Sequence, residues 1–379
     1  MDIVYLDFQK AFDKVPHVRL ISKLNAHGIN GNVSKWIAAW LSGRKQRVTL
    51  GGAASGWSDV RSGVPQGSVL GPVLFTIFIN DIDENIVSNI IKFADDTKIF
   101  SCVDNTDDAM LIVKDLDLLY AWSQDWQMSF NVEKCKVLHI GRNNDCYNYT
   151  MNGKVLHSID EEKDLGVVIH KSLKPSRHIA ESVKKANRTL GIINRCFSYK
   201  DMKIILPLYK SLVRPLLEYC SPAWSPFLKQ DIVLIEKVQR RFTRMVPGLR
   251  ELPYNLRLDF LGLIPLEVRR MRSDLIEVFK ILKGIVKINI SDLFTIREST
   301  ITRGHNLKLY KKQCNLNVRK HFFNQRVVNV WNSLPVEAVE STTINAFKSH
   351  LTTARLKLLL GDYTSQTDDS LPRQPSVPN

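Results

Sequence analysis

The sequence has no cysteines spaced to hold zinc or to form a disulfide framework. No two cysteines stand in a C-x-x-C arrangement, and no histidine falls at zinc-finger or zinc-knuckle spacing. This argues against a structural zinc site and predicts a reducing, intracellular compartment, either cytoplasm or nucleus. The six scattered cysteines are Cys102, Cys135, Cys146, Cys196, Cys220 and Cys314.

Long apolar runs are also missing. The longest, from Val69 to Ile79, is too short to span a bilayer and contains Gly71, Pro72 and Thr76. The chain opens with Met-Asp-Ile-Val-Tyr, which has no basic region of the kind that begins a signal peptide. We therefore expect no signal peptide, no transmembrane segment and no membrane partner.

Acidic residues are scarce in the second half of the chain. Residues 1–170 carry 17 Lys/Arg and 21 Asp/Glu, a net charge of −4, whereas residues 171–300 carry 25 and 12, a net charge of +13. Residues 301–379 add +6, which brings the chain to +15. An acidic part followed by a basic part fits a metal-binding centre beside a surface for a polyanion. Charge alone leaves an ordinary solvated surface equally open.

The hydrophobic pattern changes near residue 170, from short strands mixed with helices to helices almost throughout. Before that point we expect strands at 2–8, 46–50, 90–93, 98–102, 134–140, 154–157 and 164–169, and helices at 17–27, 32–42, 68–79 and 107–126. After it we expect helices beginning near Ser176 and covering 202–217, 231–246 and 265–283, with Ser176 and Asp231 as caps. The strand at 2–8 starts almost at the first residue, which predicts a further segment upstream of it.

Three carboxylates carry the chemical argument. Asp7 ends a hydrophobic strand, while Asp95 and Asp96 stand at the tip of a predicted hairpin. Magnesium prefers hard oxygen ligands, and phosphoryl transfer with two metals needs carboxylates that bridge ions roughly 4 Å apart. Taken singly, each of these residues has an ordinary explanation as a turn or cap residue.

The combination resembles the motifs of reverse transcriptases. Residues 5–15, YLDFQKAFDKV, look like motif A; residues 62–72, SGVPQGSVLGP, look like motif B; and residues 93–96, FADD, look like motif C. Residues 130–134, FNVEK, resemble motif D and residues 163–166, KDLG, resemble motif E. All five occur in the family's order. Residues 248–254 and 330–335 resemble the downstream part of Jockey-like and related non-LTR retrotransposon enzymes.

The resemblance implies a role for each matched residue. Asp7, Asp95 and Asp96 would be the metal ligands, Phe12 the steric gate against ribonucleotides, and Gln66 and Gly67 part of the nucleotide pocket. Phe12 is also a candidate core residue. Lys134 would donate a proton to pyrophosphate, although a solvated lysine is the plainer explanation. Leu165 and Gly166 would form the primer grip, and Arg240, Arg241 and Arg244 would contact the nucleic-acid backbone.

The resemblance also implies an architecture and an activity. The fold would be α+β: a palm with an antiparallel sheet over 1–170, a basic helical thumb over 171–300, a helical C-terminal region over 301–358 and a disordered tail over 359–379. The family's fingers are largely absent from the sequence. The enzyme would extend a DNA primer or target on an RNA template, using deoxynucleoside triphosphates and two Mg²⁺ ions, with Mn²⁺ as an alternative.

Other interpretations stay open. The chain could derive from a group II intron type reverse transcriptase, although no maturase-like segment follows the basic helices. It could also be a catalytically inactive or co-opted relic that only binds nucleic acid. Because the basic groups that close over the triphosphate lie before motif A in this family, we expect the 379-residue chain alone to polymerise poorly. The sequence leaves the oligomeric state open.

Overall fold

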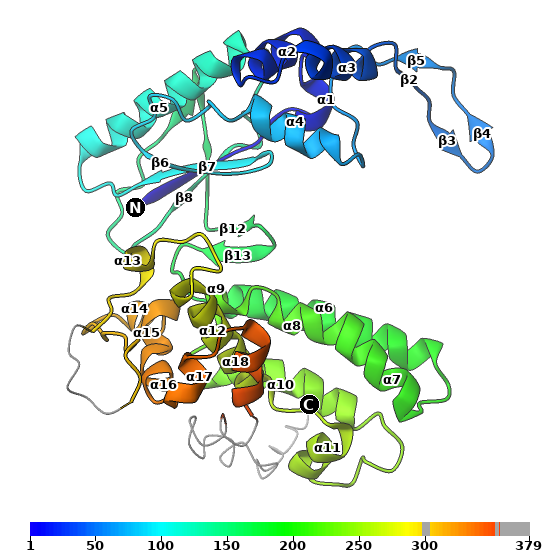
Figure 1. Cartoon of the computed structure of the whole chain (residues 1–379), viewed down its shortest axis with the longest axis vertical. Helices are drawn as coiled ribbons and strands as arrows, with labels where there is room; N and C mark the ends of the chain where they lie inside the picture. The colour runs from blue at the N-terminus through cyan, green and yellow to red at the C-terminus, as the bar shows by residue number, and fades with distance from the viewer. Residues whose placement is uncertain (298–303, 353–355, 357–379) are drawn as a thin grey trace, which may run out of the picture. The chain divides into compact units, whose positions relative to one another are not determined.

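The computed structural model describes residues 1–297, 304–352 and 356 (Figure 1). The expected disordered tail at 359–379 lies outside these residues, as do parts of the expected region 301–358. The described chain divides into two compact units. The first contains residues 1–162 and 170–172, and the second contains 163–169 and the described residues from 173 onward.

A five-stranded sheet organises the first unit, in the order β11-β8-β1-β7-β6. The strands are β1 (Asp2–Leu6), β6 (Asn89–Phe93), β7 (Asp96–Ser101), β8 (Lys136–His139) and β11 (His157–Ile159). β1 is central and antiparallel to both neighbours, while β11 pairs with β8 in parallel. The mixed α/β pattern predicted for this region is therefore present, with one parallel pair added to the expected antiparallel sheet.

Alternation along β1 decides which face of the sheet is covered. Val4, Leu6 and the following Phe8 are buried, while Ile3, Tyr5 and Asp7 are half-buried on the other face. This is the two-residue period predicted from the sequence. The buried side chains join a core formed with α2 (His17–Ala26), α3 (Gly31–Leu41), α4 (Leu70–Phe78) and α5 (Thr106–Asp125), which gather on one side of the sheet in Figure 1.

Short elements complete the first unit. The helix α1 (Ala11–Lys14) follows β1, and the pairs β2 (Lys45–Gln46) with β5 (Ser58–Asp59) and β3 (Thr49–Leu50) with β4 (Ala53–Ala54) make an exposed ribbon. The strand expected at 46–50 is thus two fragments, because each pairs within this ribbon and not with the main sheet. β9 (Thr150–Met151) and β10 (Lys154–Val155) form a hairpin around a turn at Asn152-Gly153.

The prediction of one continuous strand at 164–169 is wrong, because a turn interrupts it. The chain instead forms β12 (Glu161–Asp164) and β13 (Val167–His170), joined by a tight turn. Leu165 has a φ of 45° and Gly166 a φ of 88°. Two consecutive residues with positive φ reverse the chain, so one continuous strand cannot form here.

The second unit is helical. It contains α6 (Ser176–Cys196), a helix running through α7 (Met202–Leu208), η1 (Tyr209–Val213) and α8 (Arg214–Glu218), then α9 (Ser221–Trp224), α10 (Lys229–Thr243), α11 (Tyr254–Leu261) and α12 (Leu266–Leu282). The helix expected at 202–217 is therefore present with a π-helical segment inside it. That widened turn precedes Pro215, whose missing N–H cannot continue an α-helical ladder.

Shorter helices follow α12. They are α13 (Ile290–Leu293), α14 (Asn317–Lys320), α15 (Phe323–Arg326), α16 (Val328–Asn332), α17 (Val336–Val339) and α18 (Ile344–His350). Apart from α14, they contribute side chains to a core with α12 around the fully buried Trp331 and Phe347, while α6 to α11 share a separate core. None of the helices described by the structure is long and apolar enough to cross a membrane.

The two predicted caps are not caps. α6 begins after Pro175 and α10 after Leu228, and neither start has a side-chain cap. Instead, the Ser176 hydroxyl donates a hydrogen bond of 2.6 Å to the buried Asp231 carboxylate. Each side chain satisfies the other inside the packed helix pair, so neither serves a helix end.

Candidate functional site

The strand register brings Asp7 toward Asp95 and Asp96. Leu6 pairs with Thr97, and Asp96 pairs with Phe93 across the hairpin of β6 and β7. Asp7 therefore leaves β1 at the end of the sheet where Asp96 begins β7 and Asp95 occupies the turn, next to Ala94 with its positive φ of 52°. The strand register thus brings the ends of motif A and motif C to the same end of the sheet.

The donor chemistry of these carboxylates suits a divalent ion. Asp7 lies on the open face of the sheet with 45% of its side chain exposed, and Asp95 and Asp96 are exposed. Hard oxygen ligands open to solvent fit Mg²⁺ with its retained waters. Across the described residues, however, no three His, Cys, Asp or Glu side chains are gathered as a ready-made metal site. These residues therefore fit the ion by the type of their oxygen donors, and the strand register brings them to the same end of the sheet.

Cys135 lies beside Asp7 and was not identified from the sequence. Its Sγ accepts a hydrogen bond from the Asp7 backbone N–H at 3.5 Å. Burial, together with the nearby Asp7 carboxylate, raises the pKa of the Cys135 thiol to about 11. The thiol therefore stays protonated at neutral pH and supports the backbone of Asp7, and a thiolate ligand is not available there.

Lys134 also lies next to Asp7. Its Nζ is 3.8 Å from Asp7 Oδ2, and 68% of its side chain is exposed. The turn that carries Lys134 is held by a hydrogen bond from its backbone N–H to Asn131 O, and the Asn131 N–H donates to Asp7 O. Motif D is thus tied to motif A through the backbone. An exposed amine at this place can reach a group bound near Asp7.

The motif B loop packs directly on the turn that follows Asp7. Gly63 has a φ of 86°, and a Cβ there would lie 2.6 Å from the backbone of Asp13. Only glycine allows this approach. The Ser62 hydroxyl donates to Asp13 O, and the Gln66 side-chain amide donates to the Asp13 carboxylate at 3.1 Å. Gln66 and Gly67 are both exposed, and the space beside Gly67 is open.

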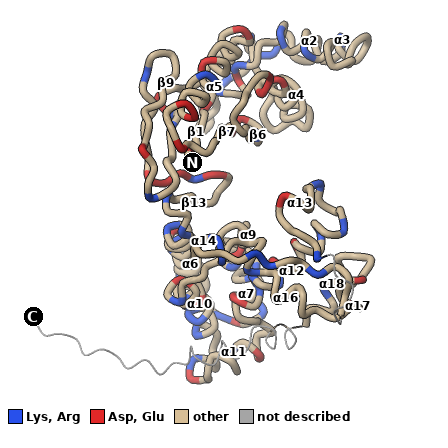
Figure 2. Tube along the Cα trace, turned by 90° about the vertical axis from the view of Figure 1, so that its left-hand side faces the viewer, with Lys and Arg blue, Asp and Glu red and all other residues tan. Residues whose placement is uncertain are grey.

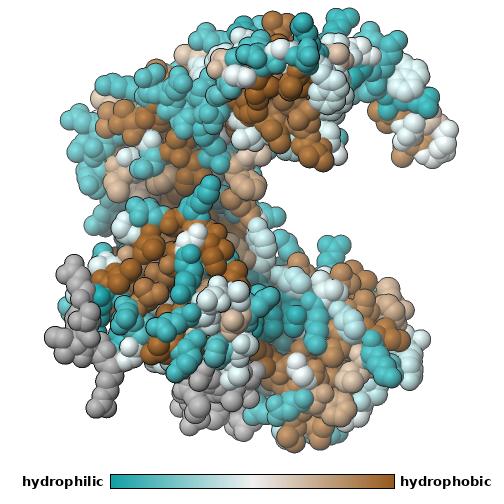
Figure 3. Space-filling model, in the orientation of Figure 1, coloured by the Kyte–Doolittle hydropathy of each residue, from teal (hydrophilic) through white to brown (hydrophobic). Residues whose placement is uncertain are grey.

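Phe12 stacks on Phe75 of α4. The ring centroids are 4.5 Å apart, and Phe12 is half-buried against the core of the first unit. The position of Phe12 is therefore compatible with both core packing and a steric gate. One face of its ring packs on Phe75, and part of the side chain stays accessible. The visible surface over α4 in Figure 3 is hydrophobic, and the exposed Val69 and Val73 belong to this segment.

A basic cluster beneath the motif B loop was missed by sequence reasoning. The Arg44 guanidinium and the His17 ring both reach Gly63 O, the latter at 2.9 Å, and Arg44 Nε donates to Leu41 O. Burial lowers the pKa of Arg44. No local pattern marks Arg44 in the sequence, because its partner carbonyl is 19 residues away.

In the second unit, Tyr219 holds the turn at Leu165 and Gly166. Its hydroxyl donates to Leu165 O at 3.0 Å, and its ring lies 3.2 Å from the point where a Cβ on Gly166 would be. Both turn residues are exposed. Tyr219 was also missed, since nothing in the sequence links the end of α8 to this turn.

The three candidate arginines of α10 differ in their surroundings. Arg241 and Arg244 are exposed, and Arg241 donates to Asn187 on α6 at 3.1 Å. Arg240 is half-buried, with its guanidinium 4.2 Å from the centre of the Tyr254 ring. The expectation that Arg240 is displayed on the exposed face is therefore only partly met, because cation–π stacking holds it against α11. Figure 2 shows basic residues along α6, α10 and α12.

Comparison with known proteins places these motifs in context. The family model described as reverse transcriptase (RNA-dependent DNA polymerase) matches residues 3–192. The chain is 31% identical to the RNA-directed DNA polymerase from mobile element jockey of Drosophila funebris, over 64% of this chain and 28% of that protein. It is 26% identical to the probable RNA-directed DNA polymerase from transposon X-element of Drosophila melanogaster, over 65% of this chain and 28% of that protein.

The chain thus spans less than a third of the length of these curated relatives. Among solved structures it is similar to telomerase from Candida albicans in complex with a fragment of telomeric RNA. That match has a TM-score of 0.26 and 11% identity, and it covers 76% of this chain and 50% of the other.

Proposed function

This chain belongs to the reverse transcriptase (RNA-dependent DNA polymerase) family, and we propose on that premise that it is the polymerase segment of a non-LTR retrotransposon enzyme. It would add deoxynucleotides to a DNA primer as directed by an RNA template. The observation that carries this proposal is the register that brings Asp7 to the end of the sheet where Asp95 and Asp96 lie.

The three carboxylates would hold two divalent ions. Mg²⁺ bound there would lower the pKa of the primer 3′-hydroxyl and neutralise charge on the triphosphate. The protein's contribution is position. Leu6 and Thr97 pair in the central strands, so the backbones that carry Asp7 and Asp96 are held by the sheet and not by a mobile loop.

Motif A and motif B would together form the nucleotide pocket. Phe12, braced by Phe75, would crowd the 2′-hydroxyl of a ribonucleotide, and the open space beside Gly67 would admit the nucleotide or template close to the backbone. Gln66 would line the same pocket, oriented by its hydrogen bond to Asp13.

Lys134 would act as the proton donor to the leaving pyrophosphate. Its amine is 3.8 Å from Asp7 and largely exposed, so it can turn from that carboxylate toward a bound triphosphate. The turn at Leu165 and Gly166 would support the primer end through its backbone, with Tyr219 fixing the position of the Leu165 carbonyl.

The architectural terms of the family follow as proposals. Residues 1–170 would be the palm and 171–300 the thumb, whose net charge of +13 suits contact with phosphates. Arg241 and Arg244 would make such contacts, and residues 301–358 would be a C-terminal helical region. The group II intron and inactive-relic interpretations are not favoured, because the matched relatives are polymerases of jockey and related transposons.

The decisive experiment is RNA-templated primer extension with Mg²⁺. It uses the 379-residue chain and a chimera in which the preceding part of the jockey relative is joined to Asp2. We expect the chimera to synthesise DNA, and Asp95→Asn to abolish that synthesis because a metal ligand is lost. Asp104→Asn, a change at an exposed carboxylate near the same sheet, is the matched control.

Two results would overturn the proposal. One is synthesis that persists in Asp95→Asn, and the other is a folded chimera that binds primer and template without extending them. Robust extension by the 379-residue chain alone would correct only the expectation that it polymerises poorly.

A further inference from the structure

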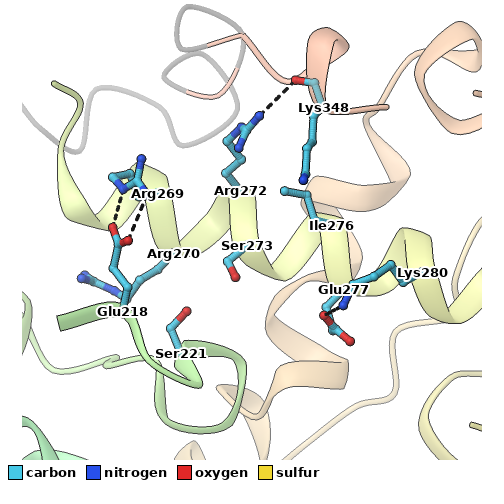
Figure 4. Close-up of a pocket in the computed structure, with 10 residues that line it drawn as sticks. All are labelled: Glu218, Ser221, Arg269, Arg270, Arg272, Ser273, Ile276, Glu277, Lys280 and Lys348. Atoms are coloured by element: carbon cyan, nitrogen blue, oxygen red, sulfur yellow. Dashed lines mark hydrogen bonds and ion pairs between the residues drawn. The ribbon is translucent and has the colours of Figure 1, made fainter. Parts of the chain in front are cut away.

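A pocket of about 320 Å³ lies in the second unit, between α12, the α8–α9 corner and α18 (Figure 4). Five basic side chains line it, from Arg269, Arg270, Arg272, Lys280 and Lys348, against the two acidic side chains of Glu218 and Glu277. The formal charge of the lining is therefore +3. Neither the motif analysis nor the proposed active site uses any of these residues.

Two of the five cations are already paired. Arg269 makes a bidentate ion pair with Glu218, which Arg214 also approaches at 3.7 Å, and Lys280 Nζ lies 2.6 Å from Glu277. The dashed lines of Figure 4 mark these pairs at opposite ends of the pocket. Both acidic side chains of the lining are thus engaged, which leaves Arg272 and Lys348 without a carboxylate partner among the lining residues.

Arg272 and Lys348 meet over the pocket. Arg272 Nη2 donates to the backbone carbonyl of Lys348 at 3.3 Å, and in Figure 4 the Lys348 side chain descends beside Arg272 toward Ile276. Burial lowers the pKa of Arg272, and the positive charge of Arg269 lowers it further. Arg272 and Lys348 thus bring two cations to one wall of the pocket.

Arg270 adds a buried donor. Its side chain is 2% exposed, and Nη1 has no hydrogen-bond partner among the described residues. Burial lowers the pKa of Arg270, while the nearby carboxylates of Glu236, Glu267, Asp274 and Glu218 favour its charged form. The charge of Arg270 is therefore balanced by neighbouring carboxylates, and the excess positive charge at the pocket wall belongs to Arg272 and Lys348.

We propose that this pocket binds a phosphate group of a nucleic-acid backbone, held by Arg272 and Lys348, which meet at one wall of the pocket. The inference rests on the proposed function, because a polymerase of this family handles nucleic acid. It adds a phosphate-binding site on α12 and α18, apart from the arginines of α10. The Arg272 guanidinium supplies forked donors that match phosphate oxygens.

A backbone phosphate fits better than a small free anion. The volume exceeds what one phosphate needs, and the lining combines a charged wall with the apolar Ile276 and the Ser221 and Ser273 hydroxyls. A phosphodiester brings an adjoining sugar that can occupy such space. The unit also carries most of the positive charge of the chain, which would guide a polyanion toward it.

The test compares two charge-matched double variants of the full 379-residue chain. Arg272→Gln with Lys348→Gln removes two pocket cations and keeps polar donors, while Lys311→Gln with Lys312→Gln removes two exposed cations elsewhere in the same unit. Binding to a fluorescent RNA–DNA hybrid is measured by anisotropy from low to high salt. We expect the pocket variant to bind about ten-fold more weakly. The slope of log affinity against log salt concentration should be less steep by about 2.

Ser273→Asp is the second variant, since it places a negative charge at the pocket wall without removing an arginine. It should weaken binding similarly while circular dichroism shows an unchanged fold. Equal losses in the pocket and control variants would overturn the proposal, as would an unchanged affinity of both pocket variants.

A competition experiment distinguishes a backbone phosphate from a free phosphate or nucleotide as the ligand of this pocket. Inorganic phosphate and a deoxynucleoside triphosphate are added to the bound hybrid, and we expect neither to displace it at micromolar concentration through this pocket. Displacement by the triphosphate in the wild type but not in the pocket variant would assign the pocket to free nucleotides instead. Asp95-dependent synthesis is measured separately, so loss of the pocket proposal and loss of the proposed function give different results.

Discussion

Some residues of the first unit belong both to the packed fold and to the proposed active site. Phe12 packs on Phe75 and borders the proposed nucleotide pocket, and Asp7 ends the central strand while remaining open to solvent. Asp2, at the other end of β1, is fully buried and accepts hydrogen bonds from His139 at 2.9 Å, Tyr149 at 2.6 Å and Asn144 at 2.7 Å. One end of the strand is therefore locked by a buried polar network while the other is exposed for chemistry.

Replacing Phe12 by Val should raise ribonucleotide incorporation relative to deoxynucleotide. The smaller side chain opens space beside the sugar, and we expect at least about ten-fold loss of discrimination. The measurement is single-nucleotide extension by the jockey chimera with matched ribo- and deoxyribonucleotides. Phe12→Tyr keeps the ring and is the control. Discrimination that survives in a folded Phe12→Val enzyme would leave Phe12 as a core residue only.

Asp2→Asn should destabilise the first unit by about 3 kcal/mol at neutral pH, because a buried hydrogen-bonded charge is removed. Burial alone would raise the pKa of Asp2, but the bonds from His139, Tyr149 and Asn144 outweigh it and hold this pKa below its usual value. A lowered pKa gives stability that is present above the unfolded pKa and lost as pH falls through the folded pKa.

The difference in unfolding free energy between wild type and Asp2→Asn should therefore be largest near pH 7. It should become smaller below about pH 4, where the carboxyl of the unfolded chain titrates. Urea unfolding at a series of pH values measures it. Asp117→Asn, at an exposed position of α5, is the control and should change little at any pH. A constant difference across this range would contradict the role assigned to the Asp2 charge.

At the scale of elements, the turn between β12 and β13 depends on a helix end that follows it by more than fifty residues. Tyr219 caps the end of α8, donates to Leu165 O and packs near Gly166. A short two-stranded hairpin is marginal by itself. Its turn is therefore positioned by tertiary contact, which a backbone support for a primer would need.

Gly166→Ala should weaken use of the primer. The substitution forces a non-glycine residue to a φ of 88° and brings its Cβ to 3.2 Å from the Tyr219 ring. We expect the KM for primer–template to rise several-fold in the chimera with a smaller effect on kcat. Gly153→Ala, at another hairpin turn with positive φ and open space, is the matched control. Equal effects of the two substitutions would show that turn strain alone accounts for the loss.

The helix α10 makes a second element-scale prediction. Arg241→Glu with Arg244→Glu should reduce affinity for an RNA–DNA hybrid, because two proposed phosphate contacts would be lost. The slope of log affinity against log salt concentration should become less steep by about 2. Lys287→Glu with Lys311→Glu makes the same charge change at other exposed positions of the unit. Arg240→Glu should act mainly on stability, since Arg240 stacks on Tyr254. Binding as tight as wild type by the Arg241/Arg244 variant would remove α10 from the proposed thumb surface.

At the scale of the whole molecule, the two parts of the chain differ in net charge and have separate hydrophobic cores. Residues 1–170 carry −4 and residues 171–300 carry +13, and the first unit has its own core while the second has two. Acidic residues gather around the N-terminal strand in Figure 2. An acidic metal-binding unit and a basic unit for nucleic acid are the arrangement that the proposed function requires.

Separate cores predict separate stabilities. Leu20→Ala, in the core of the first unit, should lower the unfolding free energy of that unit by roughly 2–5 kcal/mol through cavity formation, and Leu275→Ala should do the same in the second. Peptide-resolved hydrogen exchange in increasing urea measures both units in one sample. Each variant is the control for the other. Equal loss of protection throughout the chain in either variant would show a single cooperative unit.

The sequence by itself determined the residue types and the local elements. The alternation of Val4, Leu6 and Phe8 separated the two faces of β1, and the Asp-Asp turn fixed the hairpin of motif C. The helical stripes fixed both bounds of α5 and α12 within one residue and the start of α6. These features depend on neighbours a few residues apart, which a sequence displays directly. The order of the motifs indicated the family in the same way.

Only the tertiary structure decided the long-range partners. Ser176 bonds to Asp231 and not to a helix end, Arg240 lies on Tyr254, and Tyr219 reaches Leu165. The cations of the α12 pocket meet Lys348, which is 76 residues from Arg272. Such contacts depend on how packed helices bring distant side chains together, and buried polar groups take whichever partner the packing presents. No spacing in the sequence records that choice, because the energy that fixes it arises only once the cores have formed.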